Sequence, residues 1–150
     1  MSESQEMQTT LLSRGWKTAK SAGAFMDLVG PLWVRRESAD VGDGAHEGWR
    51  YGLLLSPCHL NPAGVVHGGL LETLMDHALS AIAWEAAGRA PCLSLQLDAH
   101  FLSAARAGEF IEASGLVVHR TRSMVFLRGS LRVGEREVMA AQALMKVQKV

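Results

Sequence analysis

The sequence predicts an α+β fold in which one long helix packs against an antiparallel sheet. Its 150 residues match the size of a single ordinary domain, and its composition, 48% hydrophobic and 20% charged, supports a folded core. An apolar pattern with helical spacing covers residues 71–86, and a two-residue alternation begins at residue 93. Strand-like segments with short connections follow. A long helix followed by a run of strands predicts two layers, with the helix lying on the sheet.

A helical extension over residues 1 to about 29 is expected before the sheet begins. The first eight residues are typical of a frayed terminus. Apolar residues then recur at helical spacing, and they predict a helix that reaches residue 26 or 29: Leu11, Leu12, Trp16, Ala19 and Ala22. Gly30-Pro31 would end this helix.

The longest helical pattern follows two strands and an irregular segment. Residues 32–37 and 49–56 are typical of strands, and the turn-rich residues 40–46 would join them. Residues 57–69 hold two prolines and three glycines, which regular structure does not tolerate. Apolar residues at steps of three and four then predict one buried helical stripe: Leu71, Leu74, Met75, Ala78, Leu79, Ile82 and Ala86. Gly88 supplies a stop signal.

Four strands are expected after the long helix. Between residues 93 and 101 every odd position is apolar, and every even position from 94 to 100 is polar. This alternation predicts a strand whose odd positions form the buried face. Residues 110–119 and 125–133 predict two more strands with a hairpin connection. Residues 137–147 predict the last strand, although alanine, which is frequent at its centre, is a poor strand former.

Charge and composition exclude several classes of protein. The formal net charge is zero and the pI is near 7.0, so a nucleic-acid backbone is a poor match as a partner. No apolar run reaches the roughly 18 residues of a membrane helix, and the first seven residues are polar and acidic, unlike a signal peptide. Cys58 and Cys92 are too few for a disulfide framework. A cytoplasmic protein without a nucleic-acid or membrane partner is expected.

The irregular segment and the start of the long helix resemble a known family. The resemblance is to the hotdog-fold thioesterases of the PaaI-like acyl-CoA group, and it lies in Asn61-Pro-Ala-Gly-Val-Val-His-Gly-Gly-Leu70 followed by Thr73-Leu-Met-Asp76. In that family an N-x-x-G-x-x-H-G-G loop opens the central helix, and an acid lies two turns in. Ser94 and residues 101–109 and 120–124 are also similar, so that the likeness covers roughly residues 30–148. The chain departs from the family at Ala105, where a proline is frequent.

This resemblance implies an acyl-CoA thioesterase that hydrolyses a thioester to a free acid and coenzyme A. It implies Asp76 as general base or nucleophile, the Gly68 N–H as oxyanion donor, and Ser94 as a residue that positions the water beside Asp76. Homodimers, often doubled to homotetramers, are implied as well, with no cofactor beyond the coenzyme A of the substrate. The acyl group is expected to rest among apolar residues beside the helix.

The chemistry of the residues supports these roles and leaves plainer alternatives. A helix N-terminus has unpaired N–H groups and a partial positive charge, and Gly68 and Gly69 let another molecule approach that backbone. Glycines there also simply make a turn. Asp76 lies in the interior of the expected helix, although aspartate is a weak helix former. It shares a flank with Gly69, Thr73 and Ser80, small residues expected where a ligand or another backbone comes close. A solvated surface aspartate is the alternative.

Three further polar residues have two interpretations each. Asn61 offers an amide donor and acceptor that suit a water or a carbonyl group, but Asn-Pro is also an ordinary turn starter. His67 is expected either beside the oxyanion or as a residue that holds the loop together. On the strand pattern alone Ser94 lies on the polar, exposed face.

Three arginines are candidate ligands of coenzyme A phosphates. Arg106, Arg120 and Arg122 fall in expected turns, and the guanidinium group suits phosphate geometry, although each is equally plain surface charge. Cys58-His59 has no further Cys or His at ligand spacing, so no metal site is expected.

Two other functions remain open, and one geometric constraint applies to the site. A hotdog dehydratase would use His67 and Asp76 to move protons on a hydroxyacyl thioester, and a non-catalytic protein would only bind acyl-CoA. Gly68 and Asp76 lie eight residues apart, about 12 Å along one helix, whereas attack on a carbonyl needs roughly 3–3.5 Å. One active site is therefore predicted to use Gly68 of one chain and Asp76 of another.

Overall fold

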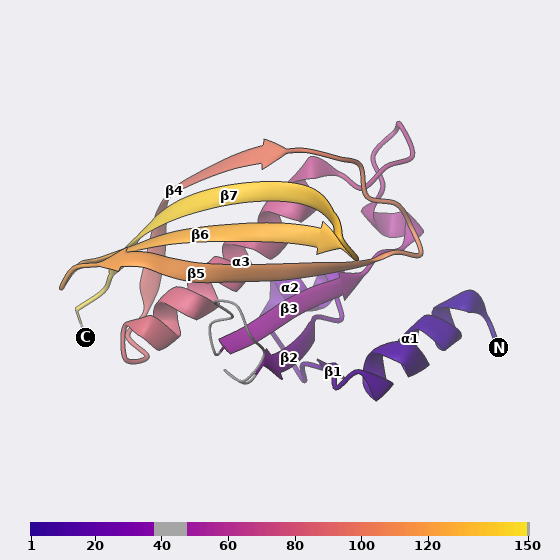
Figure 1. The fold of residues 1–150 in the computed structure, drawn as a ribbon, viewed down its shortest axis with the longest axis horizontal. Helices are drawn as coiled ribbons and strands as arrows, with labels where there is room; N and C mark the ends of the chain where they lie inside the picture. The colour runs from indigo at the N-terminus through magenta and orange to yellow at the C-terminus, as the bar shows by residue number, and fades with distance from the viewer. Residues whose placement is uncertain (38–47, 150) are drawn as a thin grey trace.

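An antiparallel sheet curves along one long helix (Figure 1). The computed structural model describes residues 1–37 and 48–149. Its helices are α1 (Glu3–Ser13), α2 (Ala24–Val29) and α3 (Gly68–Ala86). Its strands are β1 (Lys17–Thr18), β2 (Trp33–Glu37), β3 (Gly48–Leu54), β4 (Cys92–Phe101), β5 (Phe110–Arg120), β6 (Met124–Val133) and β7 (Arg136–Val147). The connection expected at residues 40–46 lies outside the described residues.

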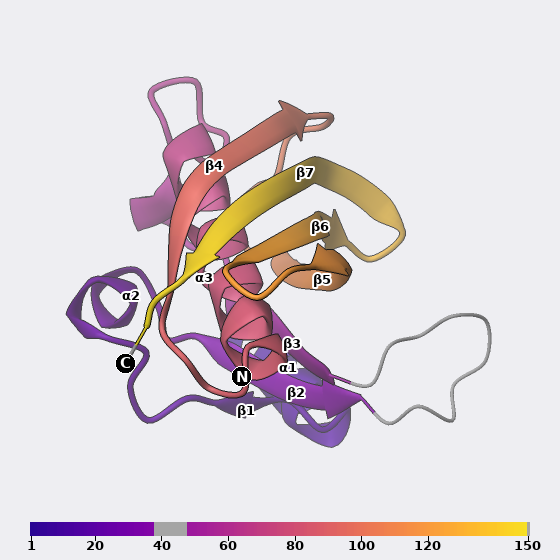
Figure 2. The same cartoon turned by 90° about the vertical axis from the view of Figure 1, so that its left-hand side faces the viewer.

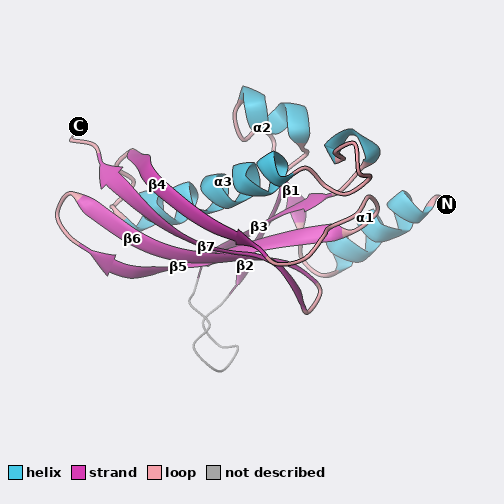
Figure 3. Ribbon diagram, turned by 90° about the horizontal axis from the view of Figure 1, so that it is seen from above, coloured by secondary structure: helices cyan, strands magenta, loops and turns pink. Residues whose placement is uncertain are grey.

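The strands pair in the order β1-β2-β3-β5-β6-β7-β4, and every pair is antiparallel. α3 lies along one face of this sheet, and α2 lies beside α3 on the side away from the sheet (Figures 2 and 3). The α+β prediction of a long helix on an antiparallel sheet is therefore confirmed. No helix in the described ranges is long and apolar enough to cross a bilayer.

The N-terminal helices are not where the apolar spacing predicted a helix. α1 already begins at Glu3, because the side chains of Ser2 and Gln5 cap its first turn reciprocally. It ends at Ser13, and Gly15 follows with φ 83°, a value that favours glycine. The frayed terminus and the single helix reaching residue 26 or 29 are thus wrong. The chain instead forms β1 and then the separate α2.

A small second core lies on the face of the sheet opposite α3. Side chains alternate along a strand, so the burial of Ile111 in the main core places Phe110 on the other face. Trp16 and Trp33 are buried there at 2% and 4% exposure. Phe110 meets Trp16 edge-on with ring centroids 4.8 Å apart, and the Arg35 guanidinium lies 4.8 Å from the Trp16 ring. The second core holds α1 to the sheet through Leu11, at the end of that helix.

Trp16→Ala is expected to lower the free energy of unfolding by about 3–5 kcal/mol, because it empties a buried aromatic site. Leu12→Ala is the matched control, since Leu12 is 59% exposed one residue along α1 from buried Leu11, and a change within about 0.5 kcal/mol is expected. Chemical denaturation measures both. Equal losses in the two variants would show that the second core does not contribute as described.

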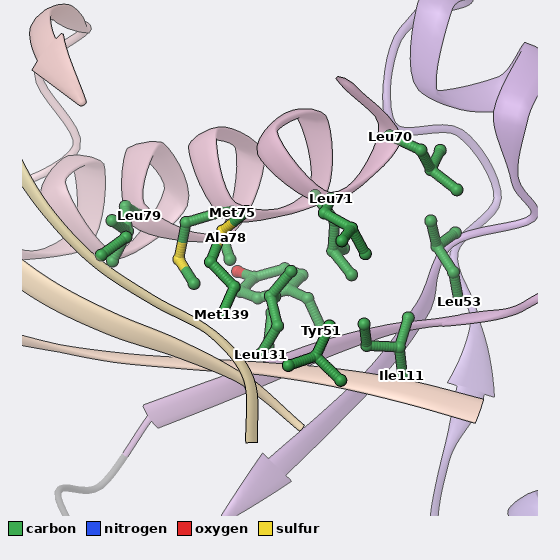
Figure 4. Packing of buried hydrophobic residues seen from close by; sticks show 14 of the residues in the cluster. Tyr51, Leu53, Leu70, Leu71, Met75, Ala78, Leu79, Ile111, Leu131 and Met139 are labelled. Atoms are coloured by element: carbon green, nitrogen blue, oxygen red, sulfur yellow. The ribbon is translucent and has the colours of Figure 1, made fainter. Parts of the chain in front are cut away.

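The main core lies between α3 and the sheet, as the apolar stripe predicted. Figure 4 shows side chains of α3 pointing at Tyr51 and Ile111 on the strands. α3 comes close to the sheet because Gly129 of β6 has no side chain, since a Cβ there would lie 2.6 Å from the Met75 sulfur. The buried residues of α3 are Leu70, Leu71, Leu74, Met75, Ala78, Leu79 and Ala83.

β4 does not keep one face along its whole length, because Leu95 forms a β-bulge. Ser94 and Gln96 pair with adjacent residues of β7, so Leu95 is the extra residue. Ser94 pairs with buried Met145 and therefore faces α3. Leu93 and Leu95 are instead 56% and 55% exposed. The prediction that all odd positions are buried is thus wrong for these two leucines, since the bulge reverses the alternation.

β4 is also an edge strand. Its described neighbour in the sheet is β7, on one side only. Phe101 and Leu102 at its end are 53% and 54% exposed, so that apolar side chains stand at both ends of the strand. A long edge strand with exposed apolar side chains is a template for pairing with another chain.

Candidate active site

The segment before α3 is fixed to α2 by a buried histidine. His59 is 6% exposed. Its Nδ1 accepts a hydrogen bond from the Ser56 N–H at 3.0 Å, and its Nε2 donates to the Val29 carbonyl at 2.7 Å. The His59 carbonyl in turn accepts from the His67 N–H at 2.8 Å. His59 therefore ties the end of α2 to the start of α3. No pattern in the sequence indicated this structural role of His59.

Asn61 holds the loop with its own side chain. Its Oδ1 accepts hydrogen bonds from the Ala63 N–H at 2.9 Å and the Val65 N–H at 3.4 Å. Its backbone N–H donates to the Val65 carbonyl at 2.8 Å. No hydrogen bond within the described ranges uses the side-chain Nδ2. Asn61 thus fills the turn-forming role.

His67 caps the N-terminus of α3. It has extended backbone angles, φ −61° and ψ 132°, and its Nδ1 accepts from the Gly69 N–H at 2.9 Å. The Gly68 N–H has no acceptor among the hydrogen bonds of the described residues. Because this end of the helix also carries the positive end of its dipole, the Gly68 N–H is a ready donor to a developing oxyanion. We call Asn61, His67 and Gly68 the loop cluster.

Asp76 lies two turns further along α3 and is bound to β4. Its Oδ1 accepts a hydrogen bond from the Ser94 hydroxyl at 2.6 Å. The bulge at Leu95 is what turns Ser94 to this side. The side chain of the neighbouring His77 meets the Tyr51 ring edge-on at 5.8 Å. Burial lowers the pKa of His77, and the charge of Asp76 opposes that shift. We call Asp76 and Ser94 the acid cluster.

The two clusters do not meet within one chain. Gly68 and Asp76 are eight residues apart in one unbroken helix, a rise of about 12 Å. Gly69 and Thr73 lie between them, and the Thr73 hydroxyl donates to the Gly69 carbonyl at 2.8 Å. Gly69 and Thr73, the candidate substrate-binding residues on this flank, therefore lie between the Gly68 N–H and the Asp76 carboxylate.

The three arginines are divided between the two ends of α3. Arg106 is exposed in the turn after β4, and its backbone N–H donates to Glu109 at 2.8 Å. Arg120 donates to the Ala86 carbonyl, at the other end of α3. Arg122 is exposed in the turn that joins β5 to β6. Because α3 rises about 27 Å over its length, one chain does not gather all three around one phosphate group.

The described part of the chain holds no group of three His, Cys, Asp or Glu side chains that fits a metal ion. His59, which adjoins Cys58, uses both ring nitrogens for hydrogen bonds to the backbone. Cys58 is exposed, and its sulfur lies 3.1 Å from the Ser56 hydroxyl. Neither residue is arranged as a metal ligand.

Several known proteins are similar to this chain in sequence or in structure. A protein of Pseudomonas aeruginosa, PA0474, whose given name is that of an esterase, is 29% identical over 131 residues, which cover 87% of this chain and 92% of that protein. The structure of BH2602 from Bacillus halodurans with CoA matches with a TM-score of 0.70 at 17% identity, covering 99% of this chain and 90% of that chain. A mutant of the phenylacetic acid degradation protein PaaI from Thermus thermophilus matches with a TM-score of 0.67 at 23% identity, covering 84% and 100%.

These likenesses confirm the hotdog fold that the sequence resemblance implied. The family model of the thioesterase superfamily matches residues 63–140, which is more than half of the chain. The match covers both α3 and β4 and therefore includes Gly68, Asp76 and Ser94. The chain belongs to the thioesterase superfamily.

Proposed function

We propose that the chain is an acyl-CoA thioesterase that hydrolyses R–CO–S–CoA and water to R–COOH and HS–CoA. One observation carries the proposal: α3 begins with the Gly68 N–H, which has no acceptor within residues 1–37 and 48–149, and it presents a carboxylate, held by Ser94, two turns further on. Membership of the thioesterase superfamily supports the reaction class. The CoA in the structure of BH2602 supports coenzyme A as the carrier of the acyl group.

The chemistry assigned to these groups is addition followed by elimination. Asp76 either removes a proton from the attacking water or attacks the thioester carbon itself. The carbonyl oxygen becomes an oxyanion, which accepts a hydrogen bond from the Gly68 N–H. The C–S bond then breaks. When Asp76 acts as general base, the proton it removed from water passes to the thiolate of coenzyme A, and R–COOH is released. When Asp76 acts as nucleophile, the break leaves a mixed anhydride on Asp76; water hydrolyses this anhydride to R–COOH, regenerates the carboxylate and supplies the proton that the thiolate takes up. Ser94 donates to one carboxylate oxygen of Asp76, so the other oxygen is left to face the water or the carbonyl carbon.

We further propose that two chains complete one site across a two-fold axis. On β4, Ser94 bonds to Asp76, whereas the ring of Phe101, seven residues further along the strand, lies over Gly68, where a Cβ would come within 3.2 Å of it. If β4 pairs with a second copy of itself so that Ser94 lies opposite Phe101 of the partner subunit, Asp76 comes next to Gly68 of the partner subunit. The same axis joins the two exposed edge strands. A two-fold dimer is the commonest assembly.

A thiol-release assay on aromatic, short, medium and long saturated acyl-CoA thioesters tests the activity. Release of one thiol per thioester is expected with at least one of them. An enoyl-CoA is included in the panel. Hydration of the enoyl-CoA without thiol release would identify a dehydratase instead. Tight binding of acyl-CoA with no turnover would identify a non-catalytic binding protein.

Hydrolysis is expected to be independent of metal ions. The attack is activated by Asp76 and the oxyanion is stabilised by a backbone N–H, so neither role needs a Lewis acid. Prolonged treatment with a chelator, followed by dialysis and assay, should leave kcat unchanged. Inhibition that only added zinc reverses would contradict this expectation and return Cys58, His59 and His67 to consideration as ligands.

A further inference from the structure

An apolar hollow of about 350 Å³ opens directly beside Gly68. It lies between the end of the loop, the first turn of α3 and the chain that follows β4. Its lining includes Val65, Leu71, Phe101 and Leu102, and Ser103 is the one polar side chain among its described lining residues. The Ser103 hydroxyl donates to the Glu137 carbonyl at 2.7 Å. The wall of the hollow therefore offers no uncommitted polar side chain to a ligand.

The ring of Phe101 lines the hollow next to Gly68. A Cβ at position 68 would lie 3.2 Å from Cε1 of Phe101, so the ring stands directly over the glycine. Phe101 pairs with buried Met139 and therefore faces the α3 side of the sheet. Even so, 53% of its side chain is exposed. Within one chain, the core and the sheet therefore cover only part of this ring.

The position of the hollow decides which part of a substrate enters it. A thioester whose oxygen accepts from the Gly68 N–H has its carbonyl carbon a few ångströms from that backbone. The substituents of this carbon therefore begin at the mouth of the hollow. Of the two substituents, the acyl chain is the apolar one, whereas the coenzyme A arm carries amides and phosphates that an apolar wall would leave unpaired.

We propose that the hollow is the acyl site and that the ring of Phe101 limits the size of the acyl group that fits there. This inference rests on the proposed thioesterase function and deepens it. A volume of about 350 Å³ is near the low end of the roughly 300–1,000 Å³ of ligand pockets. The hollow therefore favours thioesters of small apolar acyl groups over those of long chains and over those with polar substituents.

The test compares kcat/KM across straight-chain saturated acyl-CoA thioesters for the unchanged protein, Phe101→Ala and Phe101→Leu. Removing the ring enlarges the hollow, so Phe101→Ala is expected to raise the ratio of kcat/KM for long acyl groups to kcat/KM for short ones by about tenfold or more. This is the discrimination that one or two methylenes give in an apolar pocket. Phe101→Leu should give an intermediate ratio, and it remains informative if the alanine variant folds poorly.

Phe126→Ala is the matched control. Phe126 is 38% exposed on β6 and pairs with outward-facing Leu144, on the face of the sheet away from α3. It should leave the ratio unchanged. Equal changes at every chain length in both folded Phe101 variants would overturn the role of Phe101. If the unchanged protein hydrolyses no acyl-CoA thioester at all, the proposed function fails. This result differs from one in which the protein is active but the Phe101 substitutions leave its chain-length preference unchanged.

Discussion

Asp76→Ala is expected to lower kcat for acyl-CoA hydrolysis by about 100- to 10,000-fold, because it removes the general base or nucleophile. The fold should persist, since the carboxylate is half-buried on a flank of α3 and its partner Ser94 is exposed on β4. Asp76→Asn should be similarly inactive, because the amide keeps the shape but not the basicity. The thermal unfolding curve is measured beside kcat to separate chemistry from stability.

Ser80→Ala is the control for the acid. Ser80 lies on the same flank of α3, one turn beyond Asp76, and no hydrogen bond of its side chain is found in the described residues. Its removal should change kcat little. A folded Asp76→Ala variant within a few fold of the unchanged protein would eliminate Asp76 from the mechanism.

Gly68→Pro is expected to lower kcat by about 100- to 1,000-fold, because proline has no N–H to donate to the oxyanion. The helix tolerates this change, since proline suits the first helical position. The residue before it already has the extended backbone that precedes proline, as His67 has ψ 132°. No other substitution removes the donor while keeping the helix start.

Gly68→Ala is the matched control, because it adds a Cβ that meets the Phe101 ring in the same way but retains the N–H. The alanine variant should lose far less kcat than the proline variant, and any change should lie mainly in KM. If both variants lose activity equally, crowding against Phe101 explains the loss, and the N–H of Gly68 is not the oxyanion donor.

Hydrophobic spacing predicted the long helix and the strands after it, because these elements bury one continuous face. α3 and its buried stripe illustrate this. β7 also formed despite its alanines, since it pairs with β6 and β4 on both sides and tertiary pairing outweighs strand propensity. The N-terminal helices could not be placed by spacing. Their limits depend on a reciprocal cap at Ser2 and on the left-handed backbone of Gly15.

The sequence motif indicated candidate residues for the site but not the contacts that these residues make. The motif pointed to Asp76 and Gly68, whereas the alternation of β4 placed Ser94 on the wrong face, because one extra residue at Leu95 reverses every side chain before it. His59 was missed since its partner Val29 lies 30 residues away in sequence. The local sequence, a histidine three residues after a serine, does not indicate a contact with a residue so distant in the chain.

The mixing of Asp76→Ala and Gly68→Pro chains tests most directly whether one site spans two chains. The two variants are unfolded together in equal amounts and refolded, and each variant refolded alone serves as the baseline. In a mixed dimer, Gly68 of the first chain meets Asp76 of the second in one intact site, while the other site carries both defects. About a quarter of the original activity should return, since half of the dimers hold one intact site of two. Activity that stays at the baseline, with mixed dimers shown to form, would place the whole site within a single chain and contradict this account.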